Sequence, residues 1–367
     1  MYNVAPLPKA KGLLGYHPSL EQEIFAFQQT AYPTRRIDWI APRWRWMFLA
    51  SAQRLGVAPM IWLYRNASGV VAHQGVIPVK LKVREQELTT GWFVETMALE
   101  SVRGKAIGPM VIKKALEELP FNLSLGQTAQ MRAIQLAMGW QQVAPLQTYV
   151  FILNPRQVLA AKIAPRLARN AAVFGLAVLQ FGSRTAGYRR LCWQATVEEI
   201  ARFDRRHDTL WQEVQHEYPC AVVRDASYLN WKYVEQPGQH FLRLEIQRDG
   251  RIVAIAVVLI VAPGSVYPYR RGFLVDMVVP ISDREVVWAV LDSVRRVCQQ
   301  RAVASLTCYL ISHQLRKAMT SFGFFPKKPT RFLLVATEGV SAAISRVVLS
   351  PAQWFITLGD SDIDRPW

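Results

Sequence analysis

Short runs of apolar and β-branched residues recur along the chain, and turn residues separate them. In both halves, two such runs flank a compact turn, which is typical of a β-hairpin. The first turn is Asn66-Ala-Ser-Gly69, and the second contains Asp249-Gly250. We therefore predict one hairpin in each half, with strands over Pro59–Tyr64, Val70–Val79, His240–Gln247 and Ile252–Val261.

The segment after each hairpin is repeated. Gly91-Trp-Phe-Val-Glu-Thr-Met97 corresponds to Gly272-Phe-Leu-Val-Asp-Met-Val278, and a helix-like pattern follows each of these strand-like runs. Upstream of the hairpins, Arg45-Trp-Met-Phe48 corresponds to Asn230-Trp-Lys-Tyr233, where we expect each helix to end. The order helix, hairpin, strand, helix, strand, helix, strand is therefore expected twice. The remaining predicted elements are helices over Gly108–Leu119 and Asp283–Arg301 and strands over Phe121–Leu125, Thr148–Leu153, Ala304–Ile311 and Arg331–Ala336.

Matching residues also mark the later helix of each half. Thr128 and Ser312 stand at the helix starts, where their hydroxyls can accept hydrogen bonds from backbone amides. Gly139-Trp140 and Gly323-Phe324 stand at the ends, where a glycine stops the helix and the aromatic side chain docks. Strands that alternate with helices predict an α/β (α+β) fold.

We predict two units of the same architecture. They are expected over residues 1–154 and 191–340, joined by a basic helical stretch at 155–190. The tail, residues 341–367, is expected to fold back on the body because it carries Trp354, Phe355 and Trp367. A length of 367 residues agrees with two domains of ordinary size.

Composition excludes several classes of protein. Apolar residues make up 51% of the chain and charged residues 19%, which excludes disorder over most of its length. The longest apolar run, Ile252–Ala262, falls short of the ~18 residues that a membrane span needs. Prolines interrupt the N-terminal stretch, so we expect no export signal and a cytoplasmic protein. Four cysteines without metal-ligand spacing argue against structural zinc and a disulfide framework: Cys192, Cys220, Cys298 and Cys308.

The charge balance points to an anionic partner. The chain has 44 basic and 27 acidic side chains, a net charge of +17, and a pI near 10.0. Such a surface suits nucleic acid, a phosphorylated cofactor, an acidic carrier protein or a membrane surface, and charge alone does not choose among them. The basic residues are dispersed in pairs, which excludes a disordered basic tail.

A candidate phosphate site follows the strand Trp92–Leu99. The segment Arg103-Gly-Lys-Ala-Ile-Gly108 leads into a helix, and Pro109 suits the first helical turn. Its small residues allow backbone amides to face one concavity at the positive end of a helix, which binds phosphate. Arg103 and Lys105 add full charges there. The alternative is an ordinary strand-to-helix turn with two solvated cations.

This segment resembles the Arg/Gln-x-x-Gly-x-Gly/Ala pyrophosphate loop of the GNAT superfamily of acyltransferases. The resemblance covers residues 40–153 with the cofactor motif and 195–336 without it. It implies two GNAT-like units, each a mixed, mostly antiparallel sheet flanked by helices, and acetyl-CoA or another acyl-CoA as donor without a metal. It also implies that Arg103, Gly104, Lys105, Ala106, Ile107 and Gly108 cradle the pyrophosphate, and that backbone groups of Met97, Ala98 and Leu99 contact the pantetheine and the thioester.

The chain departs from the family pattern in three places. Ala106 replaces the central glycine, whose missing side chain allows a close approach of phosphate. Gln135 stands where the family places a tyrosine that acts as general acid. The corresponding loop of the second half, Pro280-Ile-Ser-Asp-Arg-Glu285, is acidic and lacks glycine, so we expect a degenerate second unit.

Glu95 is the leading candidate for a general base. A carboxylate within an apolar strand has its pKa raised by desolvation, which suits proton abstraction from an amine. The alternative is a structural carboxylate, since Asp276 takes the matching place in the second unit. Tyr149 is the candidate replacement for the missing acid.

Several other residues have weaker claims. We expect packing, capping or surface roles for His73, His207, His216 and His313. Trp39, Trp44 and Trp46 lie among four arginines, a mixture that stacks bases or sugars or forms an amphipathic helix on the sheet.

Three functional hypotheses remain. The first is an acyl-CoA-dependent N-acyltransferase that acts on an amine of a small molecule, sugar or peptide. The second keeps the fold but takes the acyl group from acyl carrier protein or aminoacyl-tRNA, which the net charge of +17 favours. The third is a non-catalytic binding module. The acceptor and the oligomeric state do not follow from the sequence.

Overall fold

The hairpins form where the turn residues predict them. In the computed structural model, β2 (Met60–Asn66) pairs with β3 (Gly69–Val83), and β9 (Phe241–Arg248) pairs with β10 (Arg251–Val261). Asp249 and Gly250 both have positive φ, as a two-residue hairpin turn requires. The structure describes residues 11–119, 121–160, 167–168, 170–175, 178 and 195–364. Most of the predicted join at 155–190 therefore lies outside the described residues, as do Cys192 and Trp367.

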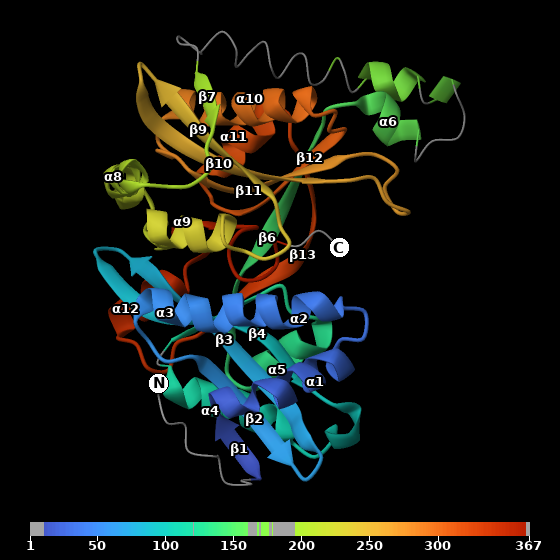
Figure 1. The fold of residues 1–367 in the computed structure, drawn as a ribbon. Coiled ribbons are helices and arrows are strands. Elements are labelled where there is room, and N and C mark those ends of the chain that lie inside the picture. The colour runs from blue at the N-terminus through green and yellow to red at the C-terminus, as the bar shows by residue number, and fades with distance from the viewer. Residues whose placement is uncertain are drawn as a thin grey trace.

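The repeated order of elements is present (Figure 1). Each unit begins with a short strand and two helical segments, continues through a hairpin and a further strand, and ends with helix, strand, helix, strand. The elements of the first unit are β1 (Gly12–Gly15), η1 (Pro18–Leu20), α1 (Glu21–Ala31), α2 (Ile37–Arg45), η2 (Trp46–Ala50), α3 (Ser51–Leu55), β2, β3, β4 (Gln86–Ala98), η3 (Glu100–Val102), α4 (Ile107–Glu118), β5 (Asn122–Leu125), α5 (Ala129–Ala137) and β6 (Gln141–Ile152).

The second unit repeats this order. Its elements, with those of the join and the tail, are α6 (Pro155–Ala160), β7 (Thr196–Glu199), α8 (Arg205–Val214), η4 (Gln215–Glu217), β8 (Cys220–Val222), α9 (Ala226–Tyr233), β9, β10, β11 (Arg271–Val278), α10 (Arg284–Gln300), β12 (Ser305–Ile311), α11 (Leu315–Phe322), β13 (Phe325–Ala336), α12 (Ala342–Val348), η5 (Pro351–Gln353) and β14 (Ile356–Thr357).

The two units exchange their last strands. The sheet runs in the order β1-β2-β3-β4-β5-β13-β6-β12-β11-β10-β9-β7. The final strand of the second unit, β13, pairs with β5 of the first, while β6 of the first pairs with β12 of the second. In Figure 1, β6 and β13 run side by side between the two halves of the molecule. Both strands are longer than predicted because each has partners on both sides.

Corresponding tryptophans meet where the units face each other. The rings of Trp46 and Trp231 stack with centroids 4.9 Å apart and an interplanar angle of 15°. Trp46 Nε1 donates to the carbonyl oxygen of Trp231 at 2.8 Å, and Trp231 Nε1 donates to that of Trp46 at 3.1 Å. A reciprocal contact between matching residues is typical of a two-fold relation, here within one chain. The predicted helix end at Phe48 is wrong, because a π-helical turn, η2, carries the helix on through α3 to Leu55.

The helix stops and their aromatic side chains are confirmed. Gly139 and Gly323 have φ of 89° and 105°, which ends the preceding helices. Trp140 packs edge-on against Phe93, and Phe324 packs against Phe151. The tail also folds back as expected, with Trp354 and Phe355 buried. The core is therefore continuous across both units.

Candidate functional site

Strand β4 bends at Glu95. The register between β3 and β4 shifts between the Gly75–Val94 and His73–Met97 pairs, and Glu95 has φ of 53°, a strained value for this residue type. The carbonyl oxygen of Glu95 accepts from His73 Nδ1 at 3.0 Å, while Trp44 Nε1 donates to His73 Nε2 at 3.2 Å. The buried histidine is thus satisfied on both nitrogens in its neutral form, as expected, and burial lowers its pKa. It positions the bulge.

Beyond the bulge, β4 and β5 separate. The two strands pair in parallel only at Gly91–Asn122 and Trp92–Leu123. The amide of Leu99 donates to Val71 O at 2.9 Å, and the register places Ala98 opposite Ala72. Because hydrogen-bonded and non-bonded pairs alternate, the N–H of Ala98 faces away from β3 and toward this opening. Met97, Ala98 and Leu99 therefore line the path that the sequence predicts for the donor.

The N-terminus of α4 follows this opening, and no side chain caps it. Gly104 and Ala106 both have left-handed φ, of 80° and 58°, and residues 103–106 are exposed. Among the hydrogen bonds of the described residues, none uses the amides of Gly104, Ala106, Ile107 or Gly108. Open amides at a positive helix end, with two exposed cations beside them, fit a pyrophosphate.

The second unit has neither an open gap between its strands nor an uncapped helix start. At the start of α10, Asp283 accepts from the amides of Glu285 and Val286 at 2.9 and 3.1 Å, so its own carboxylate occupies the helix end. The tail fills the gap between β11 and β12: β14 pairs with β12, and the amide of Gly359 donates to Val275 O at 2.9 Å. An anion that approached the start of α10 would meet the negative charge of Asp283, whereas no carboxylate caps the start of α4.

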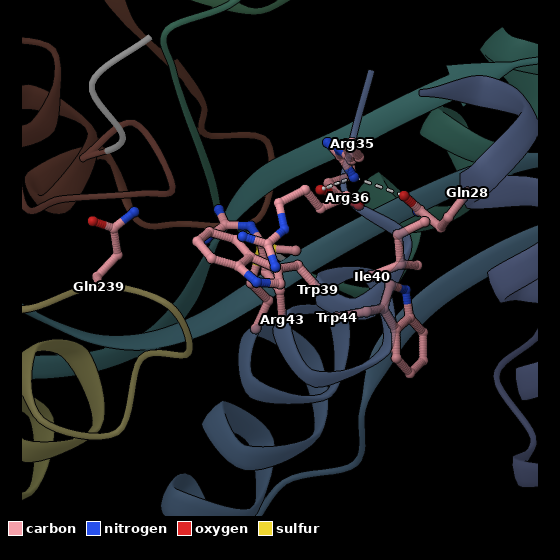
Figure 2. A pocket seen from close by; sticks show the side chains of 10 residues that line it. Gln28, Arg35, Arg36, Trp39, Ile40, Arg43, Trp44 and Gln239 are labelled. Carbon is pink, nitrogen blue, oxygen red and sulfur yellow. Dashed lines mark hydrogen bonds and ion pairs between the residues drawn. The ribbon is translucent and has the colours of Figure 1, made fainter. Parts of the chain in front are cut away.

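A pocket of about 240 Å³ lies on the other side of the Glu95 bulge. Most of its wall comes from α1, α2 and the loop between them, and Figure 2 shows Gln239 apart from these residues, on the loop before β9. Its lining residues are Gln28, Arg35, Arg36, Trp39, Ile40, Arg43, Trp44, Met47, Glu95 and Gln239. The second unit forms one side of this pocket, since Gln239 lines it and Gly238 lies against the ring of Trp39.

Glu95 forms an ion pair at the inner end of the pocket. Arg35 Nη1 lies 2.8 Å from Glu95 Oε1 and also donates to Gln28 Oε1 at 2.8 Å. The Glu95 side chain is 2% exposed and the Arg35 side chain 24% exposed. The Glu95 carboxylate is therefore buried together with a cationic partner, and not alone among apolar side chains as its place in the strand suggested.

Asp276 occupies the corresponding place in the second unit, and both of its carboxylate oxygens already accept hydrogen bonds. It accepts from Arg224 Nε at 3.0 Å, Tyr233 Oη at 2.7 Å, Thr357 Oγ1 at 3.0 Å and its neighbouring amide of Met277 at 2.9 Å. It lines neither the pocket beside Glu95 nor a second pocket, which Asp208 and Trp211 of α8 line. Its role is structural.

Tyr149 does not join this site. It is buried on β6, opposite Cys308 of β12 and Pro326 of β13. Two strands, β5 and β13, separate β6 from β4, a distance of three strand steps or ~14 Å. Burial also raises the pKa of Tyr149. Its assignment as general acid remains a prediction with little geometric support.

The other candidates have structural places. Gln135 is buried and exchanges hydrogen bonds with Ser124 Oγ at 3.0 and 3.1 Å, so it replaces the family tyrosine with a packed amide. His207 is buried beside Glu245 and completes a capping box with Asp204, while His216 and His313 are exposed. The sequence reasoning missed Arg35 and Arg43 as pocket residues, although both stand in the mixed arginine and tryptophan stretch that it singled out.

No helix of the described residues has both the length and the apolar content needed to cross a bilayer. Within the same residues, no three His, Cys, Asp or Glu side chains gather closely enough to hold a metal ion. Cys220, Cys298 and Cys308 are buried free thiols.

Comparisons with known proteins identify the fold. No protein-family model matches the sequence, and no curated protein matches it. Solved structures match over most of the chain. A conserved Enterococcus faecalis protein, an N-acyltransferase candidate, has a TM-score of 0.63 at 10% identity, over 90% of this chain and 73% of its own. N-myristoyltransferase of Saccharomyces cerevisiae with bound myristoyl-CoA has a TM-score of 0.56 at 12% identity, and the match covers 91% of this chain and 84% of its own.

A GCN5-related N-acetyltransferase from Anabaena variabilis gives a TM-score of 0.61 at 9% identity, over 89% of this chain and 72% of its own. The chain therefore has the GNAT-like fold that its sequence predicted, with helices flanking a large, mostly antiparallel sheet.

Proposed function

We propose that this chain is an acyl-CoA-dependent N-acyltransferase whose first unit holds the donor. One observation carries the proposal: in the first unit, unlike the second, β4 and β5 part beyond Trp92, and the helix that follows, α4, begins without a side-chain cap. The structural neighbours, which include an N-acetyltransferase and a myristoyl-CoA-bound N-myristoyltransferase, support the same reaction class.

In this proposal the donor binds at the carboxyl end of β4 and the helix start that follows, and the acceptor binds beside Glu95. Arg103, Lys105 and the amides of residues 104–108 would hold the pyrophosphate, and the amide of Ala98 would donate to the thioester carbonyl oxygen as negative charge develops there. The acceptor would lie in the 240 Å³ pocket, with its amine near Glu95. Only about four residues, ~13 Å of strand, separate Glu95 from Leu99, so one donor can reach both regions.

Transfer needs a neutral amine. Its nitrogen forms a bond to the thioester carbon, the carbon–sulfur bond breaks with loss of CoA, and one proton must leave the nitrogen. The Glu95 carboxylate, alone or through a water molecule, would accept that proton, which typically contributes 10²–10⁴-fold to the rate. Arg35 fixes the carboxylate at the inner end of the pocket.

Calorimetry with acetyl-CoA and longer acyl-CoA esters tests the donor site. Arg103→Glu should weaken binding by about 100-fold, because it places a negative charge at the phosphate position. Arg284→Glu is the matched control, since Arg284 is an exposed arginine at the corresponding helix start of the second unit. Equal effects of the two variants, or no binding of any acyl-CoA, would contradict the proposal.

The larger anionic donors give a different result in the same assay. Aminoacyl-tRNA or acyl carrier protein would contact a broad basic surface, and binding would weaken steeply as the salt concentration rises. Activity with free acyl-CoA that persists at high salt would exclude them. Mass spectrometry of the purified chain for bound acyl species identifies the donor directly.

A further inference from the structure

Five large apolar side chains are exposed in two segments of the chain. Three lie in the helical residues after α6, where Leu167 is 87% exposed, Phe174 73% and Val178 54%. Two lie in the loop between β10 and β11, where Val266 is 78% exposed and Tyr267 37%. Single exposed apolar residues are ordinary on a protein surface, whereas several that gather on one surface mark a site of interaction.

The large apolar residues of the helical segment share one face. Residues 167–168, 170–175 and 178 are helical. Leu167, Ala171, Phe174 and Val178 follow one another at intervals of four, three and four residues, and all four are exposed. This spacing places them along one stripe of an α-helix, which we call the exposed stripe. The apolar stripe of a surface helix normally faces the core, so its outward position here needs an explanation.

Helix α6 connects the two exposed segments. It precedes the helical residues along the chain, and its Val158 packs with Tyr269 of the β10–β11 loop in one apolar cluster. Within that loop the rings of Tyr267 and Tyr269 meet edge-on, and the guanidinium of Arg271 lies 4.1 Å from the centre of the Tyr267 ring. Figure 1 shows α6 and the helical residues after it at the periphery of the second unit. The stripe and the loop therefore belong to the same end of the molecule.

The charge of this end has one sign in the sequence. Residues 155–190 include seven basic side chains and no acidic one. The loop, residues 262–271, adds Arg270 and Arg271, again without an acidic residue. Basic residues that flank an exposed apolar stripe are typical of a helix that lies in the interface of an anionic membrane. Charge complementarity therefore selects a negatively charged partner that also accepts apolar side chains.

Other partners satisfy only one of these two properties. A nucleic acid offers phosphates and aromatic bases, and the aliphatic side chains of Leu167, Val178 and Val266 would gain little from either. A second copy of the chain would bring the same positive charge to the same face. An anionic bilayer offers phosphate headgroups to the arginines and acyl chains to the stripe, and tyrosines such as Tyr267 concentrate at its interface.

We infer that this end of the chain docks on the surface of an anionic lipid bilayer, with the exposed stripe and the tip of the β10–β11 loop inserted among the headgroups. A short apolar stripe with basic flanks lies in the plane of the interface, so the docking is peripheral and reversible. The inference goes beyond the proposed function and does not depend on it, because it uses neither the donor site nor the pocket beside Glu95.

Sedimentation of the full chain with lipid vesicles tests the docking. Vesicles of phosphatidylcholine alone are compared with vesicles in which phosphatidylglycerol replaces a third of the lipid. We expect at least about 10-fold tighter binding to the anionic vesicles, and weaker binding as the salt concentration rises. No sedimentation with either kind of vesicle, or the same affinity for both, would overturn the inference.

Matched variants separate insertion from attraction by charge alone. Leu167→Ser and Phe174→Ser should each weaken binding to the anionic vesicles by about 10-fold, since each removes an inserted apolar side chain. Leu136→Ser is the control, because Leu136 is an exposed leucine on α5 of the first unit, and it should have no effect. Binding that all three variants leave unchanged would show that the net charge of +17 acts alone, which contradicts the inference.

A second pair of variants tests the position of the charge. Arg156 is exposed on α6, and Arg156→Glu should weaken binding to the anionic vesicles by about 10-fold or more. Arg205→Glu makes the same change in net charge on α8, which lies at the opposite side of the second unit in Figure 1, and should have a much smaller effect. Equal effects would contradict a defined docking face. Circular dichroism checks that each variant folds.

The same variants address the other occupants. Dimerisation that Leu167→Ser abolishes, measured by analytical ultracentrifugation, would assign the stripe to a second copy of the chain. Binding of an RNA duplex that depends on Arg156, without binding to vesicles, would assign the basic residues to a nucleic acid. Either result would overturn the inference and leave the proposed function untouched, since calorimetry with acetyl-CoA should be the same for Leu167→Ser and for the unchanged chain.

Discussion

The two units share one order of elements but differ at every point that the donor would touch. In the first, β4 and β5 part, α4 begins without a cap, and the bulge carboxylate Glu95 faces a pocket. In the second, β14 fills the gap, Asp283 caps α10, and Asp276 is surrounded by donors. Under the proposed function, the same scaffold serves once as a donor site and once as a support, and a few side chains and one tail segment distinguish the two units.

The backbone of the bulge also differs between the units. Both strands have a register shift beside the carboxylate, but only Glu95 has a positive φ. Behind the bulge, His73 opposes Met97, and Ile255 opposes Val278 at the corresponding place of the second unit. Strained residues often persist at functional sites because surrounding contacts hold them. Here the hydrogen bond from His73 to the carbonyl oxygen of Glu95 is such a contact. The second unit has Ile255 at this place, whose side chain cannot donate a hydrogen bond.

The largest effect is expected from the two carboxylates. Asp276→Asn breaks a buried ion pair with Arg224 and should lower the free energy of unfolding by about 3–5 kcal/mol. Glu95→Gln should cost about 1–2 kcal/mol, because Arg35 is partly exposed and can turn toward water, yet lower kcat by about 100-fold. Urea unfolding and steady-state kinetics at a temperature where both variants are folded measure the two quantities. Similar losses of stability and activity in both variants would abolish the distinction between site and support.

A pH titration tests the role of His73. Burial lowers its pKa in the folded chain below the ordinary ~6.5 of the unfolded chain. Below pH ~6.5 the unfolded state therefore binds more protons, so stability should fall as the pH falls, by up to about 1.4 kcal/mol per pH unit. His73→Gln should remove this part of the dependence in urea titrations between pH 5 and 8.

The surface residue His313 provides the control for that titration. Because it is exposed, His313→Gln should leave the pH dependence of unfolding as it is. A slope that persists unchanged in His73→Gln would show that other groups are responsible.

The helix caps are expected to give a smaller effect. Asp283→Ala removes the cap of α10 and should destabilise the chain by about 1 kcal/mol. It would also open the amides of Glu285 and Val286, which makes this helix end resemble that of α4. Thermal unfolding measures the loss. Calorimetry with acetyl-CoA should still detect one site, since β14 continues to fill the second gap; a second site would show that the cap alone excludes the donor.

The smallest effect concerns Ala106. Its left-handed φ of 58° costs about 1 kcal/mol in alanine, and the extra freedom of glycine in the unfolded chain offsets much of the gain. Ala106→Gly should therefore raise the free energy of unfolding by about 0.5 kcal/mol or less. Removal of the methyl group should tighten acyl-CoA binding, measured by calorimetry, if it narrows the phosphate approach. Gly104→Ala, which needs the same backbone region, should move stability in the opposite direction.

The sequence by itself determined the elements and their repetition. Turn residues located both hairpins, and the strand ends lie within two residues of the predicted ones except in β3, which continues beyond Val79 to Val83. Gly139 and Gly323 stopped their helices, and the loop at residues 103–108 was located at a helix start. These features depend on local chemistry: positive φ at turns, capping at helix ends and the alternation of apolar residues. Local rules act on neighbouring residues, so a single chain is enough to apply them.

Only the tertiary structure decided which segments meet. The exchange of β6 and β13, the filling of the second gap by β14, and the pairing of Arg35 with Glu95 join residues far apart in sequence. The pattern of β6 is compatible with any neighbouring strand, and an arginine in a loop has many possible partners. Such contacts form because the folded sheet brings residues from distant parts of the chain together. Local sequence preferences do not depend on which distant residues become neighbours, so they cannot predict these contacts.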